Sequence, residues 1–306
     1  MSFKSRVVFS YNADEIIREF AKKNSETDIA VYSRKSGESI TTFLSPSRFP
    51  DKVSSLTDAL YPSQINLVSV KAINRELAEV LVALSLAGRK QSIFLLDDGI
   101  DSGRFERLLS DAGITSYEFT EERGLALAER IERIDTAQAE SELKVVVDQA
   151  FKVRGVGTVA LGFVMSGILR KHDLLHISYS GKSTQVKSIQ MQDIDVSEAS
   201  TGSRVGIALK NVDVDDLGRG TVLSVNPITE KDILEGEIVY HNSLKSRLQM
   251  GSEVFVSDCM RYQRGKLSEQ SVKLDRPLAI TEHEYLLSNP NITPRVFGKI
   301  MINAGI

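Results

Sequence analysis

The 306-residue sequence has little of three things that would place it in a specialised class of protein. It holds a single cysteine, Cys259, so no disulfide can form within the chain, and this composition suits a reducing cytosol. No apolar run approaches the roughly 18 residues that cross a bilayer, and the first residues show no signal-peptide core. The net charge is only −3, which gives no global excess of cations for a polyanion. These absences predict a cytoplasmic protein with no membrane partner.

The charge that is present is unevenly divided. Residues 1–143 hold 18 Lys and Arg against 23 Asp and Glu, whereas residues 144–306 hold 20 against 18. A polyanion-binding surface is therefore expected in the second half, although two ordinary solvated surfaces would give the same counts. The length is enough for two or three domains, each with its own core.

The first 134 residues alternate strand and helix signals. Helices are expected after Asn12, over Glu76–Leu86, after Ser102 and after Thr120, because apolar residues recur there every three or four positions. Asn12, Ser102 and Thr120 are the expected N-caps. Strands are expected where β-branched and apolar residues cluster, at 6–9, 28–33, 40–44, 65–70, 92–96 and 115–119, the second and third forming a hairpin. This alternation predicts a doubly wound parallel sheet.

The apolar period changes from 3.6 to 2 after the polar, alanine-rich stretch Asp135–Glu142. Short strand signals then follow one another with glycine turns between them, which is typical of a small barrel. Asn226-Pro227 interrupts this series, and a second set of strand signals follows. The expected fold class is α/β plus all-β, with an α/β domain over 1–138 and two β-barrels over 143–225 and 226–306.

Part of the β region carries a family resemblance, in Phe151–Val159, Val186–Met191, Gly202–Ala208 and Leu217–Leu223. In that order and at that spacing these stretches resemble the second domain of the elongation factor Tu superfamily. Val186–Met191 and the residues around Gly202–Ala208 are most similar to the archaeal selenocysteine-specific elongation factors. The resemblance is strong over about 144–224 and weaker over 225–306, where Pro294–Ile300 is the clearest piece. It implies a guanine-nucleotide type of α/β domain followed by two barrels.

The nucleotide motifs of that family are largely missing. The loop after the first strand has no glycine, and Asp14 and Glu15 stand about where a Gly-Lys pair should hold phosphate. Two carboxylates there would repel a triphosphate. Only Pro46 remains of the Asp-x-Pro-Gly motif, only Asp101 remains of the base-reading Asn-Lys-x-Asp, and a short hairpin replaces the long switch loop. We therefore expect a pseudo-GTPase with no cofactor and no catalytic residue, in which Asp14, Pro46 and Asp101 are remnants.

Other chemistry-bearing residues form no recognisable site. Gly181-Lys-Ser183 lacks the earlier glycine of a phosphate loop and joins two strand signals, so it is expected to be a hairpin turn. His172 and His176 lie in a predicted strand, where four residues span about 13 Å, too far for one zinc. Cys259 has no nucleophile context, and no metal site is predicted.

The resemblance implies which residues would contact RNA. The matching positions of the first barrel are Asp148, Phe151, Arg154, Thr158 and Arg204, and Arg295 and Lys299 alternate with apolar residues in the last strand. Phe151 offers a stacking platform worth about 1–3 kcal/mol per base, and the cations can pair with phosphate. Phe151 equally suits a barrel core, and Arg295 and Lys299 equally suit a plain solvated face.

Three functions fit these observations. The first is a translation-associated protein that binds tRNA or another RNA through its barrels, with the ribosome or another translation factor as a further partner. The second is a protein-interaction module that docks on the translation machinery, and the third is a GTP-binding factor with an atypical site. An unrelated small α/β domain would also alternate strands and helices. Fold resemblance alone does not choose among these, and no feature indicates an oligomeric state.

Overall fold

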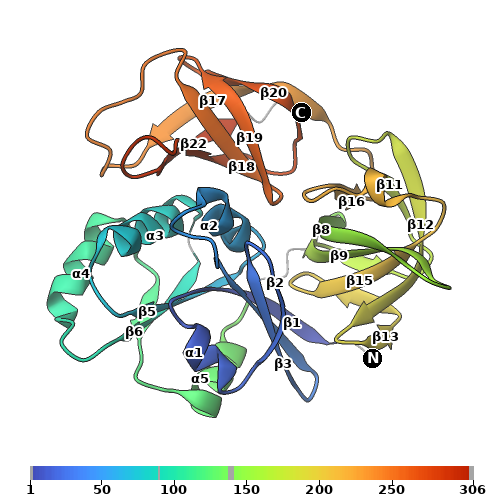
Figure 1. Cartoon of the computed structure of the whole chain (residues 1–306), viewed down its shortest axis with the longest axis horizontal. Helices are drawn as coiled ribbons and strands as arrows, with labels where there is room; N and C mark the ends of the chain where they lie inside the picture. The colour runs from blue at the N-terminus through green and yellow to red at the C-terminus, as the bar shows by residue number, and fades with distance from the viewer. Residues whose placement is uncertain (1–2, 89, 137–140, 303–306) are drawn as a thin grey trace.

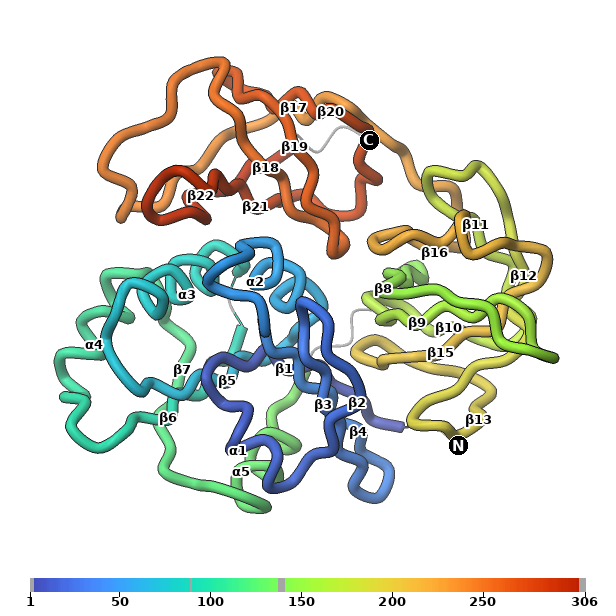
Figure 2. Tube along the Cα trace, viewed as in Figure 1, coloured from blue at the N-terminus to red at the C-terminus, as the bar shows by residue number. Residues whose placement is uncertain are grey.

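The structure, a computed structural model, describes residues 3–88, 90–136 and 141–302. It consists of an α/β part and two β-barrels, which lie around a common junction (Figures 1 and 2). The α/β part comes first in the chain, the first barrel lies beside it, and the second barrel covers its helices α2 and α3. The predicted fold class is confirmed.

A seven-stranded sheet forms the centre of the α/β part, in the order β2-β3-β4-β1-β5-β6-β7. Strands β4, β1, β5, β6 and β7 are parallel, while β2 and β3 are antiparallel additions at one edge. The strands are β1 (Lys4–Tyr11), β2 (Lys22–Glu26), β3 (Ala30–Ser36), β4 (Ser39–Ser45), β5 (Ile65–Val70), β6 (Gln91–Leu96) and β7 (Tyr117–Phe119). The predicted hairpin is the β3–β4 pair.

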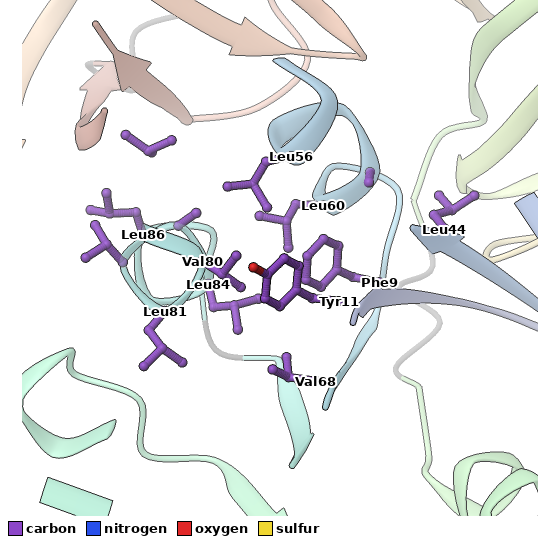
Figure 3. Packing of buried hydrophobic residues seen from close by; sticks show 14 of the residues in the cluster. Phe9, Tyr11, Leu44, Leu56, Leu60, Val68, Val80, Leu81, Leu84 and Leu86 are labelled. Carbon is purple, nitrogen blue, oxygen red and sulfur yellow. The ribbon is translucent and has the colours of Figure 1, made fainter. Parts of the chain in front are cut away.

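Helices cover both faces of this sheet. On one face, α1 (Asp14–Arg18) and α5 (Gly124–Arg133) enclose a core that includes Val8, Tyr32 and Phe43. On the other face lie α2 (Val53–Leu60), α3 (Arg75–Leu86) and α4 (Ser102–Asp111). Figure 3 shows the second core, where side chains of α2 and α3 meet those of β1 and β5.

Two elements of the α/β part depart from the prediction. The helix after Asn12 ends at Arg18, and the chain turns into the edge strand β2, whose polar sequence gave no strand signal. Helix α2 was not predicted because it is only eight residues long and half of those residues are polar, although all eight are buried.

Three predicted helix caps are also wrong. Asn12 adopts a left-handed conformation outside α1, whose N-cap is Ala13. Asp101 takes the place expected for Ser102: its Oδ1 accepts the backbone N–H of Arg104 at 2.6 Å at the start of α4. Helix α5 begins at Gly124, four residues after Thr120, the predicted cap.

The first barrel closes six strands, β11-β16-β8-β9-β15-β12, through the β11–β12 pair. The turn with Gly155 and Gly157, called the glycine turn below, joins β8 to β9. Gly181 lies in the β11–β12 hairpin as predicted. The strands are β8 (Lys144–Val153), β9 (Gly157–Ser166), β11 (Leu174–Ile177), β12 (Lys182–Met191), β15 (Arg204–Leu209) and β16 (Val222–Ser224), with β10 (Ile168–Arg170), β13 (Ile194–Val196), β14 (Glu198–Ser200) and the short 3-10 helix Val214–Asp216 beside them.

The second barrel is closed in the order β17-β20-β19-β18-β21-β22. Strands β19 and β21 were not predicted, because their polar residues broke the alternation. The strands are β17 (Glu230–Tyr240), β18 (Glu253–Asp258), β19 (Arg261–Leu267), β20 (Ser271–Ala279), β21 (Glu284–Ser288) and β22 (Val296–Ile302).

The domain boundaries stay predictions. The first falls around 137–140, outside the described residues, and the second falls between β16 and β17. Among the residues that the structure describes, no helix is long and apolar enough to span a membrane.

Candidate functional site

The carboxyl ends of β1, β4, β5 and β6 meet at one edge of the sheet, where doubly wound proteins bind their ligands. Asp14 lies here at the start of α1. Its Oδ1 accepts a hydrogen bond from the Tyr32 hydroxyl at 2.7 Å, and its Oδ2 accepts one from Ser45 Oγ at 2.8 Å. The carboxylate therefore ties the loop after β1 to β3 and to the end of β4.

The other residues singled out at this edge have structural contacts. Glu15 is exposed and pairs with Lys71, at 3.3 Å between Oε2 and Nζ. The carbonyl of Pro46 accepts the backbone N–H of Phe49 in a turn. Asp101, which was predicted to be a remnant of the base-reading motif, caps α4, and its remnant role stays a prediction. This edge thus presents the carboxylates of Asp14 and Glu15 and the short helix α1.

A second candidate site lies on the first barrel, around the glycine turn between β8 and β9. Phe151 and Arg154 are exposed there, with 40% of Phe151 accessible to solvent, so the alternative that Phe151 belongs to the barrel core is wrong. Thr158 is buried, and its hydroxyl donates to the carbonyl of Val212 at 2.7 Å. Thr158 therefore positions the turn and offers no free hydroxyl.

Three exposed lysines surround a hollow of about 480 Å³ beside this turn: Lys152, Lys187 and Lys210. Lys187 Nζ donates to the carbonyl of Val156, and Lys152 pairs with Asp213 at 3.0 Å. We call Lys152, Arg154, Lys187, Lys210 and the exposed Phe151 the turn surface. Its lysines escaped prediction because they come from three different strands or strand ends, and only the pairing of β8, β9, β15 and β12 brings them together.

Asp148 lies elsewhere, at the contact between the α/β part and the first barrel. Arg219 Nη2 approaches Asp148 Oδ1 at 3.3 Å, and its Nη1 donates to both carboxylate oxygens of Asp28 at 2.9 Å. Asp58 of α2 lies 3.7 Å from the same guanidinium. We call these four residues the Arg219 cluster.

Burial and charge shape the titration of this cluster. Burial raises the pKa of Asp58 to about 7, because its cost to the charged carboxylate outweighs the attraction of Arg219. Burial also raises the pKa of Asp148. Burial would raise the pKa of Asp28 too, but hydrogen bonds and charge from Lys52 and Arg219 outweigh it and lower that pKa.

Arg204 is half-buried near Asp148, and its buried Nε has no hydrogen-bond partner within the described chain. Burial lowers the pKa of Arg204, while the charge of Asp148 opposes this. The RNA contacts predicted at Asp148 and Arg204 are untested, but both side chains face an internal contact, so we leave them outside the turn surface.

The two cations of the last strand region are also engaged within the chain. Arg295 Nε donates to Glu79 Oε2 of α3 at 2.8 Å, and its guanidinium lies over the ring of Phe49. Lys299 pairs with Glu284 at 2.6 Å. The alternative that both form a plain solvated face does not hold for Arg295, which joins the second barrel to the α/β part. Phosphate contacts at Arg295 and Lys299 remain untested predictions.

A metal site can be assessed only where the side chains are described. Within 3–88, 90–136 and 141–302, no group of three or more His, Cys, Asp or Glu is placed to hold a metal ion. The prediction that both histidines lie in a strand is wrong for His172, which has a left-handed backbone in the turn before β11. His176 lies within β11, where its Nδ1 is 3.2 Å from Ser183 Oγ.

Comparison with known proteins places this geometry in a family. Residues 157–224 match the family described as elongation factor Tu domain 2. The uncharacterized protein MJ0325 of Methanocaldococcus jannaschii is 32% identical over 236 residues, which is 72% of this chain and 77% of that protein. The chain belongs to the elongation factor Tu superfamily. The predicted resemblance is thereby confirmed.

Other superfamily members share shorter stretches or the fold. The selenocysteine-specific elongation factor of the same archaeon is 44% identical over 84 residues, 28% of this chain but only 18% of that factor. The solved structure of elongation factor SelB from Methanococcus maripaludis with the GTP analogue GppNHp superposes with a TM-score of 0.80. It covers 99% of this chain and 80% of SelB at 18% identity, which shows a common fold. M. jannaschii therefore has two proteins similar to this chain, MJ0325 and a selenocysteine-specific factor.

Proposed function

We propose that this superfamily member binds RNA through the turn surface of its first barrel, without a nucleotide-driven cycle. The exposed ring of Phe151 and the exposed cations Lys152, Arg154, Lys187 and Lys210, all near the turn between β8 and β9, support the proposal most directly. An aromatic side chain can stack a base, and the cations around it can neutralise the adjacent phosphates.

The second barrel lends this proposal less support. Its cations Arg295 and Lys299 are mostly buried and held by Glu79 and Glu284, so an RNA contact there would have to break a partly buried ion pair. The Lys152–Asp213 pair of the turn surface, by contrast, is exposed to solvent. The first barrel is also the part that matches the family most closely, over residues 157–224. We therefore assign the proposed RNA contact to the first barrel.

The absence of a nucleotide cycle is proposed from the edge of the sheet. A phosphate loop needs backbone N–H groups that converge on the ligand, and glycines that let the backbone wrap it. Here Asp14 brings a carboxylate to this position and holds it with Tyr32 and Ser45. We infer that RNA affinity is not switched by GTP and that release depends on competition or on a partner.

The experiment is fluorescence anisotropy of a labelled tRNA with the intact protein over a series of salt concentrations. Arg154→Ala is expected to reduce the slope of log K against log salt by about 1, because one phosphate contact is lost. Phe151→Ala is expected to weaken binding about 5- to 150-fold at every salt concentration without changing the slope, because stacking carries no charge. Mg·GTP and Mg·GDP should leave the affinity unchanged.

The matched control is Arg107→Ala, which removes an exposed cation from α4, a helix that lies far from β8 and β9 of the first barrel (Figure 1). It should leave both affinity and slope as they are. The proposal fails if tRNA does not bind at low salt, or if Arg107→Ala and Arg154→Ala have equal effects. An affinity that changes at least ten-fold with GTP would contradict the absence of a switch.

A further inference from the structure

The hollow beside the turn surface contains an acidic side chain. Among the described residues that line it, Asp213 carries the only carboxylate, against the three lysines Lys152, Lys187 and Lys210. Lys187 donates to a backbone carbonyl, and Lys210 Nζ donates to Gln185 Oε1 at 2.7 Å. Within the described chain, Lys152 is the one of the three with a charged partner, because its Nζ lies 3.0 Å from Asp213 Oδ1.

The backbone around Asp213 is held in place. Asp213 is the N-cap of the short 3-10 helix: its side chain accepts the backbone N–H of Asp216, and Asp216 Oδ2 accepts the backbone N–H of Asp213 at 3.1 Å. Lys182 Nζ donates to both carboxylate oxygens of Asp216, at 2.8 and 2.9 Å. The Thr158 hydroxyl donates to the carbonyl of Val212 at 2.7 Å. These contacts keep the Asp213 carboxylate at the rim of the hollow.

The Lys152–Asp213 ion pair is open to exchange with a ligand. Its two side chains are 69% and 72% exposed. An exposed pair of this kind changes an equilibrium constant by at most about five-fold. An RNA phosphate can therefore displace the carboxylate from Lys152, but it has to compete with it. Because the backbone is fixed, the displaced Asp213 stays close and repels the phosphate.

We propose that Asp213 is an internal competitor for RNA phosphate at Lys152 and thereby weakens binding by the turn surface. The inference rests on the proposed function and adds a means of release to it. Release without a nucleotide cycle requires competition, and Asp213 supplies a competing anion from within the chain. The carboxylate pairs with Lys152 again as RNA leaves, which favours dissociation.

A double-mutant cycle tests this with two ligands, a labelled tRNA followed by fluorescence anisotropy and inorganic polyphosphate followed by calorimetry. Asp213→Asn is expected to strengthen the binding of both about 3- to 5-fold at about 50 mM salt, because Lys152 becomes free for a phosphate. The slope of log K against log salt for tRNA should steepen by about 0.7–0.9. In a chain that already carries Lys152→Ala, Asp213→Asn should change affinity less than two-fold.

The matched control is Asp215→Asn. Asp215 is an exposed carboxylate of the same 3-10 helix but is not among the residues that line the hollow. The control removes the same charge without freeing Lys152, so it should change affinity less than two-fold. Asparagine is itself a good N-cap, so Asp213→Asn should keep the 3-10 helix. If that variant does not fold, Asp213→Ser, which also places an N-cap residue there, replaces it.

Four results would overturn the proposal. They are equal gains from Asp213→Asn and Asp215→Asn, an equal gain from Asp213→Asn with and without Lys152, weaker binding by Asp213→Asn, and no binding of either ligand.

The two ligands separate this inference from the proposed function. If tRNA does not bind but polyphosphate follows the expected pattern, the proposed function fails and the competition at Lys152 stands. If tRNA binds and Asp213→Asn leaves its affinity unchanged, the competition fails and the proposed function stands.

Discussion

At the scale of single residues, the buried carboxylates at the contacts between domains stand out. Burial raises the pKa of Asp58 to about 7, and burial likewise raises the pKa of Asp258 to about 7. Asp258 accepts hydrogen bonds from Cys259 Sγ and Thr281 Oγ1, but these do not offset the loss of water. Both groups therefore bind a proton more tightly in the folded chain than in the unfolded one.

This gives a pH dependence with a definite sign. A carboxyl whose folded pKa lies above its unfolded value destabilises the fold as it ionises, so the free energy of unfolding should fall as pH rises from about 4 to about 7. Asp28, whose pKa is lowered, affects stability only below that window. Asp258→Asn should reduce the slope between pH 5 and pH 7 by about 1 kcal/mol per pH unit. Urea unfolding at several pH values measures it.

The control for this prediction is Glu121→Gln, which neutralises an exposed carboxylate in the loop before α5 and should leave the slope unchanged. If Asp258→Asn and the wild-type chain show the same slope, Asp258 is ionised throughout the window and its raised pKa is refuted.

At the scale of elements, the short loop Gly218–Gly220 between the 3-10 helix and β16 performs two structural roles. It carries Arg219 into the contact with Asp28, Asp58 and Asp148. Its last residue, Gly220, has a left-handed backbone, with φ of +77°, and lies against the second barrel. A Cβ at Gly220 would come 2.6 Å from the carbonyl oxygen of Cys259 and would also clash with Arg261. The loop thus brings both barrels and the α/β part together.

Gly220→Ala should therefore destabilise the chain by about 2–4 kcal/mol, the sum of a left-handed alanine and an overpacked contact. Gly155→Ala is a matched comparison, because Gly155 has φ of +80° but nothing within 4 Å of its added Cβ. It should cost only about 1 kcal/mol. Urea denaturation of both variants tests this. Equal decreases in the free energy of unfolding would mean that the interdomain contact at Gly220 does not contribute to stability.

At the scale of the whole molecule, one buried apolar cluster extends through all three parts. Phe9, Leu56 and Val80 of the α/β part belong to the same cluster as Phe163 of the first barrel and Met260 of the second. The Arg219 cluster and the Arg295–Glu79 ion pair add charged contacts across the same interfaces. The arrangement of the three parts is therefore expected to stay fixed during the proposed function.

The expected fixed arrangement and the proposed absence of a nucleotide cycle together give a simple prediction. Mg·GTP, Mg·GDP and Mg·GppNHp should leave the small-angle X-ray scattering curve and the melting temperature unchanged. A nucleotide present at 100 times its dissociation constant would add about 2.7 kcal/mol of stability, which would raise the melting temperature by several degrees. Such a rise, or a change in the radius of gyration, would show that the edge of the sheet near Asp14 still binds nucleotide.

The sequence predicts the fold well because hydrophobic periodicity and family motifs act locally. The strands at 65–70 and 92–96 are mostly apolar, and they became β5 and β6 with nearly the expected ends. Helix α2 and strand β2 were missed because their environment, not their pattern, decides their structure. The turn surface was only half predicted: Phe151 and Arg154 adjoin the glycine turn in sequence, whereas Lys187 and Lys210 reach it through strand pairing.

The cluster around Arg219 had no sequence signal. Asp28, Asp58, Asp148 and Arg219 come from a loop, a helix, a strand and another loop, and only the packing of the first barrel against α2 brings them within ion-pair distance. Arg295 is a similar case. Its alternation with apolar residues allowed a solvent-facing side chain, but nothing in the sequence indicates that Glu79 of α3 lies beside it.

The apolar cluster that crosses all three parts also limits how the protein can be dissected. Cutting the chain between β16 and β17 would leave Cys259, Met260 and Val296 on one fragment and Phe163 with the α2 side chains on the other, each without its cover. Isolated fragments would then expose apolar surface to water and would tend to aggregate. Truncation is for this reason a poor way to assign a role to either barrel, and point substitutions in the intact chain are the sounder genetic tool.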